Sequence, residues 1–265
     1  MLRNKALLGS ITALVLLLAA TVAMAQNITG TPGPDTLNGT SQADNINGLA
    51  GNDVINGLGG ADTLRGGDNK DTINGEGICP TGTTSGDSPY YCIPGNGGRD
   101  QIFGGQGGDT INGNSKGDRI AGQGGADRIN GGSGNDNITG GSSRDAINGG
   151  TGSDKVDGGS SGDAIAGAKN RDNLNGKSGN DRINGGPGND SITGGRGDDR
   201  LRGDSGNDGI SGGRAVDRVF GGSGRDTIRT RDGNRDFVDC GSGRDTAYVD
   251  RKDRVRRNCE RVFRR

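Results

Sequence analysis

The stretch Gly185-Gly186-Pro187-Gly188-Asn189-Asp190-Ser191-Ile192-Thr193 is one copy of a nine-residue unit that decides the fold. In steps of nine, aspartate recurs from Asp35 to Asp71 and, after one interruption, from Asp100 to Asp226. Each of these twenty aspartates has a glycine five residues before it and Leu, Ile or Val two residues after it. Three columns that repeat together identify a repeat protein.

The unit predicts a short strand between two turns. One apolar residue every nine positions cannot form the stripe of an amphipathic helix, and the many Gly and Asn residues disfavour a helix. The pattern favours a strand of about three residues around the apolar position. Glycines at the first and fourth positions are expected to adopt the positive φ that tight turns need. Because one unit offers a single Ile-sized side chain, stacked neighbours must supply the core, which predicts a β-solenoid.

The composition excludes a conventional globular domain and several kinds of site. The 265 residues include 58 Gly, no Trp and no His, with 27% hydrophobic and 3% aromatic residues. This composition alone is typical of a disordered chain, whereas the strict nine-residue period indicates a fold. The two observations agree if the chain is disordered without metal and folds when metal binds. Without histidine the chain lacks the usual base for a serine nucleophile and cannot form a His-based zinc site, so we expect no enzyme. An acidic array without aromatic platforms also predicts no nucleic-acid partner.

The consensus Gly-Gly-x-Gly-x-Asp-x-(Leu/Ile/Val)-x resembles the hemolysin-type calcium-binding repeat of the RTX family. The resemblance implies an all-β protein folded as a parallel β-roll, with Ca²⁺ held between successive turns by aspartates and main-chain carbonyls. The residues support the same cofactor independently. Columns of carboxylates about 4.8 Å apart repel one another unless cations intervene, and hard oxygen ligands suit Ca²⁺.

The glycine two residues before each aspartate divides the candidate metal ligands into two groups. It is present before thirteen aspartates, which are the main calcium-ligand candidates: Asp35, Asp53, Asp62, Asp100, Asp109, Asp127, Asp136, Asp154, Asp181, Asp190, Asp199, Asp208 and Asp226. Another residue replaces it in seven units, where we expect weaker or missing calcium: Asp44, Asp71, Asp118, Asp145, Asp163, Asp172 and Asp217. In some of these units a cation such as Lys116 or Arg144 enters the turn, where it would neutralise the aspartate in place of a metal.

The number of units in one coil has two possible answers. The replaced glycine falls in every third unit over much of the chain, and a triangular coil of 27 residues would bring those units into one column. Cys240 and Cys259, however, are 19 residues apart, close to one 18-residue coil of a two-sided roll, which places their side chains at disulfide range. We favour the two-sided parallel β-roll and keep the triangular coil as the alternative.

The two ends of the chain and one insertion interrupt the repeats. Arg3 and Lys5, an apolar stretch and a small-x-small site at residues 23–25 are typical of a secretory signal, so we expect export and no membrane span in the mature chain. The predicted organisation is a signal peptide at 1–25, repeats at 26–75, a Cys-containing loop insertion at 76–94, repeats at 95–234 and a cap at 235–265. Within the insertion, Cys79 and Cys92 would close a short loop.

The cap is basic and resembles the disulfide-bearing C-terminus of secreted bacterial proteins of this repeat class. From Arg229 to Arg265 there are twelve Arg and Lys residues against seven Asp and Glu. This segment is either a solvated cap of the solenoid or a surface that docks on an anionic cell-surface polymer.

The predicted function is that of a secreted, calcium-binding, non-catalytic repeat protein that acts as a structural or surface-interaction module. The alternative is an adhesin-like solenoid that binds ice or a surface polymer. Ice binding would need a regular column of threonines beside the buried Ile positions. That column includes Thr63 and Thr110 but also Arg119 and Lys155, which argues against ice.

Overall fold

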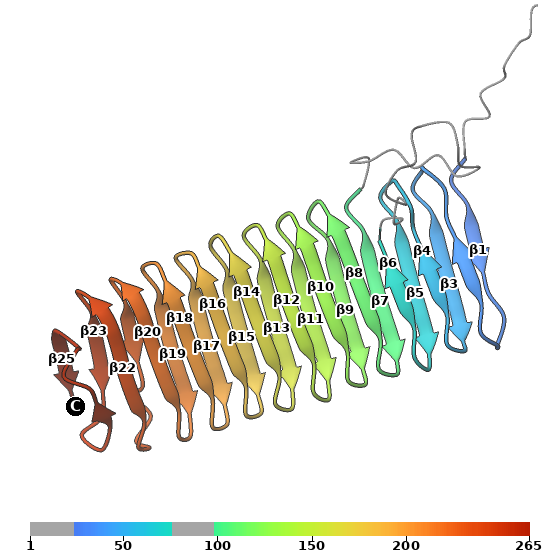
Figure 1. Ribbon diagram of the computed structural model, residues 1–265. Helices are drawn as coiled ribbons and strands as arrows, with labels where there is room; N and C mark the ends of the chain where they lie inside the picture. The colour runs from blue at the N-terminus through green and yellow to red at the C-terminus, as the bar shows by residue number, and fades with distance from the viewer. Residues whose placement is uncertain (1–23, 76–97) are drawn as a thin grey trace, which may run out of the picture.

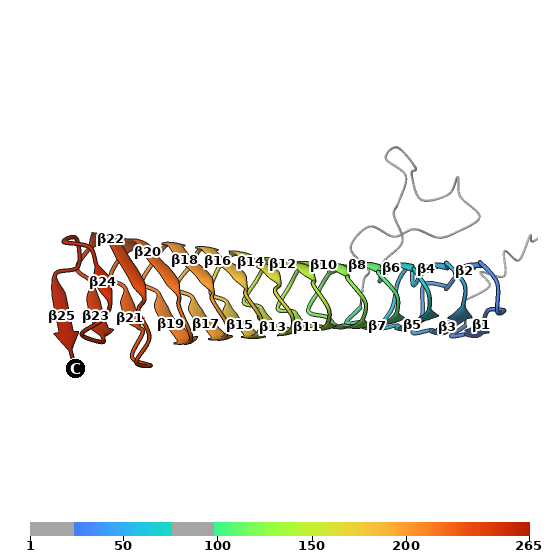
Figure 2. The same ribbon diagram turned by 90° about the horizontal axis from the view of Figure 1, so that it is seen from below.

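The computed structural model describes residues 24–75 and 98–265, which form two parallel β-sheets packed face to face (Figure 1). The odd-numbered strands make one layer and the even-numbered strands the other (Figure 2). The predicted signal peptide lies almost entirely outside the described residues, as do Cys79, Cys92 and the rest of the insertion. Within the described ranges, no helix has the length and apolar character needed to span a bilayer.

The chain alternates between the two sheets from one strand to the next. The 13-stranded sheet consists of β1 (Asn27–Thr29), β3 (Asn45–Ala50), β5 (Thr63–Asp68), β7 (Gln101–Gln106), β9 (Arg119–Gly124), β11 (Asn137–Ser142), β13 (Lys155–Ser160), β15 (Asn173–Ser178), β17 (Ser191–Arg196), β19 (Gly209–Arg214), β21 (Thr227–Arg229), β23 (Thr246–Val249) and β25 (Arg261–Arg264). The 12-stranded sheet consists of β2 (Thr36–Asn38), β4 (Val54–Asn56), β6 (Thr72–Asn74), β8 (Thr110–Ser115), β10 (Arg128–Ser133), β12 (Ala146–Thr151), β14 (Ala164–Lys169), β16 (Arg182–Pro187), β18 (Arg200–Ser205), β20 (Arg218–Gly224), β22 (Phe237–Gly243) and β24 (Arg254–Val255).

The register confirms the two-sided roll and shows that the triangular alternative is wrong. Ile129 of β10 pairs with Ile147 of β12, and Ile138 of β11 pairs with Val156 of β13, so one coil contains two units of nine residues. Each unit supplies one strand and one reversal of direction. The units with a replaced glycine therefore lie on both edges of the roll instead of forming one column.

Most strands are six residues long, so the expected length of about three was wrong. In β10, pairing covers Arg128 to Asn130 around the apolar position and resumes at Gly132 and Ser133, which pair with Gly150 and Thr151 of β12. The glycines of the repeat are thus part of the strand. Without side chains they allow successive coils to continue their hydrogen bonds into the turn.

The core is two facing columns of single aliphatic residues between the sheets. Ile46, Ile55, Leu64 and Ile73 are 0% exposed, and the column continues to Ile228 with exposures of 3% or less. The residues on either side of each aliphatic position point outward. The roll therefore has a narrow core, and the aspartates at its two edges make up much of its buried polar content.

The insertion leaves the register of the roll intact. β5 pairs with β7 and β6 pairs with β8, so the coils on either side of residues 76–97 stack directly. The backbone N–H of Asp62 donates to Asp100 Oδ1 over 2.8 Å, the same bond that other coils make with 18 residues of separation. Gly75 takes the place of the glycine five residues before the aspartate, because it lies against Asp100 Oδ2. The extra residues thus enter between Gly75 and Gly98.

Candidate metal centre

Most reversals of the chain are built from two left-handed residues, four and two positions before the aspartate. In the unit of Asp154 these are Gly150, with a φ of 109°, and Gly152, with a φ of 136°. The glycine five positions before, Gly149, is not left-handed, so the expectation that the first glycine supplies a positive φ was wrong. The residues at the second and fourth positions of the unit make the turn, and the glycine at the first position has another role.

Six of the seven replaced glycines keep a left-handed backbone. The residues concerned are Asn69, Lys116, Ser143, Ser161, Asn170 and Ala215, with φ between 72° and 86°. An added Cβ at Gly125, a glycine of this column with a φ of 112°, would collide with the carbonyl of Gly107 one coil earlier. Residues with a side chain therefore turn by a smaller φ, which changes the direction of the local carbonyls.

The aspartates form two buried ladders, one along each edge of the roll. Asp145 is 1% exposed and its Oδ1 accepts from the backbone N–H of Asp127, one coil earlier, over 2.9 Å. Its own N–H donates to Asp163 Oδ1 over 2.9 Å. The same bond joins aspartates one coil apart along the whole roll, from Asp35 N–H to Asp53 Oδ1 at one end to Asp226 N–H to Asp245 Oδ1 at the other. In the interior coils, one carboxylate oxygen of each aspartate therefore accepts a hydrogen bond from the backbone.

The second carboxylate oxygen is different. It is buried and has no hydrogen-bond partner among the described residues at Asp53, Asp62, Asp71, Asp109, Asp127, Asp136, Asp145, Asp154, Asp163, Asp172, Asp181, Asp190, Asp199, Asp208, Asp217, Asp226, Asp236 and Asp245. A buried carboxylate oxygen without a partner costs free energy unless a proton or a cation satisfies it.

The first glycine of the unit leaves open the space beside that oxygen. The point where Gly140 would carry a Cβ lies 2.5 Å from Asp145 Oδ2 and 2.5 Å from the carbonyl oxygen of Gly158 in the next coil. At Gly104 the corresponding distances to Asp109 Oδ2 and Gly122 O are 2.5 Å and 2.6 Å. A side chain would fill this position, so the unbroken glycine column keeps a carboxylate and a carbonyl facing one small space.

Burial raises the pKa of most of these carboxyls above the usual value. For Asp62 burial raises the pKa from 3.8 to about 8; the hydrogen bond from Asp44 N–H opposes the shift, and the carboxylates of Asp100 and Asp44 add to it. Burial likewise raises the pKa of Asp217 to about 8 and that of Asp199 to about 7. The ladders therefore carry an electrostatic cost when ionised without a counter-charge.

This donor set fits a hard divalent cation. Among the described residues no three Asp, Glu or Cys side chains come together as a metal-binding cluster, so each site would combine one or two carboxylates with backbone carbonyls. Calcium accepts six to eight oxygen ligands, including carboxylates and backbone carbonyls, in flexible geometry. The orphaned Oδ2 atoms and the carbonyls beside them match that preference.

The first coil satisfies its carboxylates in another way. Asp35 Oδ2 accepts from Thr31 N over 2.5 Å and from Thr31 Oγ1 over 3.0 Å, and Asp44 Oδ2 accepts in the same way from Thr40. Asp35 was predicted as a main ligand, but its Oδ2 already accepts two hydrogen bonds, unlike the Oδ2 atoms of the interior aspartates. The signal was present in the sequence, because only the first two units have threonine four residues before the aspartate.

One cationic turn offers a local substitute for a metal. Arg144 Nε donates to the carbonyl oxygen of Gly162 over 3.0 Å, one residue before Asp163. Burial and neighbouring carboxylates raise the pKa of Asp163 to about 7, while the Arg144 guanidinium acts in the opposite direction. Arg144 therefore occupies a carbonyl of the turn and partly neutralises its carboxylate.

The C-terminal cap ends both ladders with carboxylates from outside the nine-residue register. Asp253 Oδ1 accepts from Asp236 N–H over 3.0 Å, and Glu260 Oε2 accepts from Asp245 N–H over 2.8 Å. Asp253 Oδ2 is satisfied by Thr230 Oγ1 at 3.0 Å. Sequence reasoning left Asp236 and Asp245 off the ligand set because the step from Asp226 is ten residues and no glycine precedes them by five.

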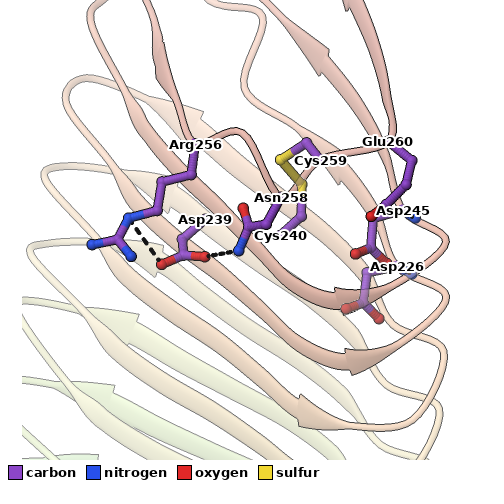
Figure 3. Close-up of a disulfide and its surroundings, with 8 residues drawn as sticks. All are labelled: Asp226, Asp239, Cys240, Asp245, Arg256, Asn258, Cys259 and Glu260. Atoms are coloured by element: carbon purple, nitrogen blue, oxygen red, sulfur yellow. Dashed lines mark hydrogen bonds and ion pairs between the residues drawn. A yellow bond between two sulfur atoms is a disulfide. The ribbon is translucent and has the colours of Figure 1, made fainter.

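The predicted disulfide closes this cap (Figure 3). Cys240 and Cys259 are bonded, with 5.2 Å between their Cα atoms. Beside the bridge, Asp239 accepts from Asn258 over 2.7 Å and pairs with Arg256 over 3.3 Å. The bridge therefore fixes the last coil on the one before it.

A search of curated proteins found no match to this chain. The family described as RTX calcium-binding nonapeptide repeat (4 copies) matches residues 29–64, 48–77, 94–115, 112–147, 139–174, 175–210 and 211–247, which together make up more than half of the chain. This match, together with the β-roll and the aspartate ladders, shows that the chain belongs to the RTX calcium-binding nonapeptide repeat family.

Proposed function

We propose that this chain is an exported, non-catalytic protein whose roll binds calcium along both edges and needs it to fold. The observation that carries the proposal is the column of buried Oδ2 atoms, each beside a backbone carbonyl in a space kept open by glycine. Bound calcium would remove the repulsion between successive carboxylates and satisfy these oxygens. Its binding free energy then becomes folding free energy.

The proposed ligands are the interior aspartates with complete turns. The set consists of Asp53, Asp62, Asp100, Asp109, Asp127, Asp136, Asp154, Asp181, Asp190, Asp199, Asp208 and Asp226. Aspartates in turns with a replaced glycine are proposed to bind more weakly, because their carbonyls are turned differently and, at Asp163, one carbonyl already accepts from Arg144. Asp35 and Asp44 are not proposed as strong sites, since threonine donates to their second oxygen.

Export supports this function, because calcium is abundant outside the cell and the cap disulfide persists there. The basic start and small-x-small site in residues 1–25 motivate the expectation. Calcium modules in that environment bind with dissociation constants of about 10⁻⁴ to 10⁻³ M. A chain that stays unfolded at low cytosolic calcium would fold once it reaches the outside.

The direct test is isothermal titration calorimetry of the chain from Gln26 with calcium, and with magnesium as the control. We expect several calcium ions per chain, fewer than the twenty repeat aspartates, and little heat from magnesium, which tolerates irregular oxygen sites poorly. Absence of calcium binding, or equal binding of magnesium, would refute the proposal.

A further inference from the structure

Arginines gather on the outer face of the 12-stranded sheet near its C-terminal end. Arg182 of β16, Arg200 of β18 and Arg218 of β20 stand in register on successive strands, followed by Phe237 of β22 and Arg254 of β24. A second row beside it contains Arg202, Phe220, Asp239 and Arg256. We call Arg182, Arg200, Arg202, Arg218, Arg254 and Arg256, all exposed, the arginine face.

The 13-stranded sheet places its arginines differently in the same coils. At the positions that correspond to the first two rows, β17 and β19 present Ser191, Thr193, Gly209 and Ser211. Its arginines in these coils are more scattered and include Arg196 and Arg214 at the ends of β17 and β19, Arg229 in β21 and Arg261 in β25. The N-terminal half of the 12-stranded sheet is neutral in its second row, where Asn56 donates to Asn38 over 2.9 Å and Asn74 to Asn56 over 2.8 Å. The in-register run of Arg182, Arg200 and Arg218 therefore belongs to one stretch of the 12-stranded sheet and is not a general property of the repeat.

The arginine face has little internal compensation. Among the described residues its ion pairs are Arg256 with Asp239, at 3.3 Å, and Arg202 with Asp204, at 3.6 Å. Arg182, Arg200 and Arg218 pair with no carboxylate in the described part of the chain, although neighbouring strands bring them to about 4.8 Å spacing. Like charges directly opposite one another on a sheet are destabilising, so the row is a cost to the fold alone.

Two phenylalanines orient the guanidinium groups around a surface pocket. Arg200 lies 5.2 Å from the ring centre of Phe220, and Arg254 and Arg256 lie 5.9 Å and 5.7 Å from that of Phe237. The two rings pack at 5.8 Å. They line a pocket of about 580 Å³ together with Arg200, Arg218, Arg254 and Arg256, and the lining also includes Arg235 and two buried aspartates, Asp217 and Asp236. Cation–π contacts hold arginines in place and leave their N–H groups free to bind an anion.

From this arrangement we propose that the arginine face binds a linear carboxylated polysaccharide lying along the stack of strands. A row of guanidinium groups repeated at the strand spacing complements a chain of repeated carboxylates, and guanidinium binds carboxylate through two parallel hydrogen bonds. The phenylalanine rings give the sugar rings an apolar contact. A nucleic acid fits less well, because two half-buried phenylalanines offer few stacking platforms for successive bases.

The proposal goes beyond calcium binding, since the groups that would contact the polysaccharide are arginines and phenylalanines. Of the proposed calcium sites, the weaker one at Asp217 borders the same pocket. It is tested in saturating calcium, where circular dichroism first verifies the fold of every variant. The probe is an oligogalacturonate too short to gel with calcium, titrated into the full mature chain by calorimetry. The test variant is the triple change Arg200→Gln, Arg218→Gln and Arg254→Gln.

The matched control removes three positive charges elsewhere, through Arg119→Gln, Arg128→Gln and Lys155→Gln. We expect the wild type and the control to bind the oligogalacturonate alike, and the test variant to bind about tenfold more weakly. Replacing the same three arginines by lysine keeps the charge but not the planar donor pair, so we expect an intermediate affinity. Raised salt should weaken wild-type binding.

Four results would overturn the inference. They are no binding by the folded wild type, an equal loss in the test and control variants, equal binding of neutral dextran, and tighter binding of inorganic polyphosphate than of the oligogalacturonate. The last result would identify a phosphate surface. Calcium calorimetry on the same samples shows separately whether the calcium proposal has failed.

Discussion

Replacing Gly140 by alanine tests the link between the glycine column and the aspartate ladder. The new Cβ would lie 2.5 Å from Asp145 Oδ2, 2.5 Å from the carbonyl oxygen of Gly158 and 3.0 Å from Ile147 Cδ1. The carbonyl belongs to the neighbouring coil and cannot move without disturbing the inter-coil hydrogen bonds. Overpacking of this kind costs about 1–3 kcal/mol, and the substitution also fills the space proposed for calcium at this turn.

The matched control is Gly209→Ala in β19. Gly209 has no left-handed φ, and the nearest atom to an added Cβ is Asp190 O at 3.8 Å. Such a change is expected to be neutral or to stabilise by about 0.4–1 kcal/mol, because it restricts the unfolded chain. The assay is urea unfolding of both variants in saturating calcium, followed by circular dichroism. If Gly140→Ala unfolds at the same urea concentration as the wild type, the glycine column does not hold the space that we describe.

Three further predictions follow from the same geometry. Asp181→Asn should lower the number of calcium ions bound in calorimetry, whereas Asp35→Asn should leave it unchanged because Thr31 already donates to Asp35. In chelator, the roll should gain stability as the pH is lowered from about 8 to about 5, which thermal unfolding would measure. Burial raises carboxyl pKa values above the unfolded 3.8, and that of Asp62 to about 8. The folded state therefore holds more protons than the unfolded chain in this pH range, so a lower pH favours folding. Replacing both Cys240 and Cys259 with alanine removes the bridge and should destabilise the cap by about 3 kcal/mol, because closing a loop of about this length lowers the entropy of the unfolded chain by that amount. The loss should appear as faster hydrogen exchange in β22 to β25.

The fold could be predicted from the sequence to the level of one coil. The apolar column from Leu37 to Ile228 defined the buried side of the strands from β2 to β21, and the spacing of Cys240 and Cys259 distinguished a two-unit coil from a triangular one. The strand length could not be read in the same way. Glycine normally weakens a strand, but here parallel pairing continues through Gly132 and Gly150 because close stacking of coils requires them.

The candidate site could be predicted only in part. Spacing identified the aspartates, but the roles of the glycines depend on contacts between coils, which no single unit contains. Gly140 is needed because of Asp145 in its own unit and Gly158 in the next coil. The hydroxyl contacts of Thr31 and Thr40 concern only the first coil, so the consensus does not reveal them. The arginine face was predicted only at its C-terminal end, where Arg254 and Arg256 belong to the basic cap. The row of Arg182, Arg200 and Arg218 was missed because its members lie 18 residues apart, with strands of the opposite sheet between them along the sequence.

The central claim, that the ladders make the fold depend on calcium, is tested most directly by small-angle scattering and circular dichroism during a calcium titration, with magnesium as the control. The account predicts an expanded chain with little β-structure in chelator at about pH 8, where the buried carboxyls would be ionised. Calcium alone should then produce a compact β-rich rod, in which a ladder of 13 strands spans about 58 Å. A chain that is already a rod of this length in chelator, and does not respond to calcium, would contradict the account.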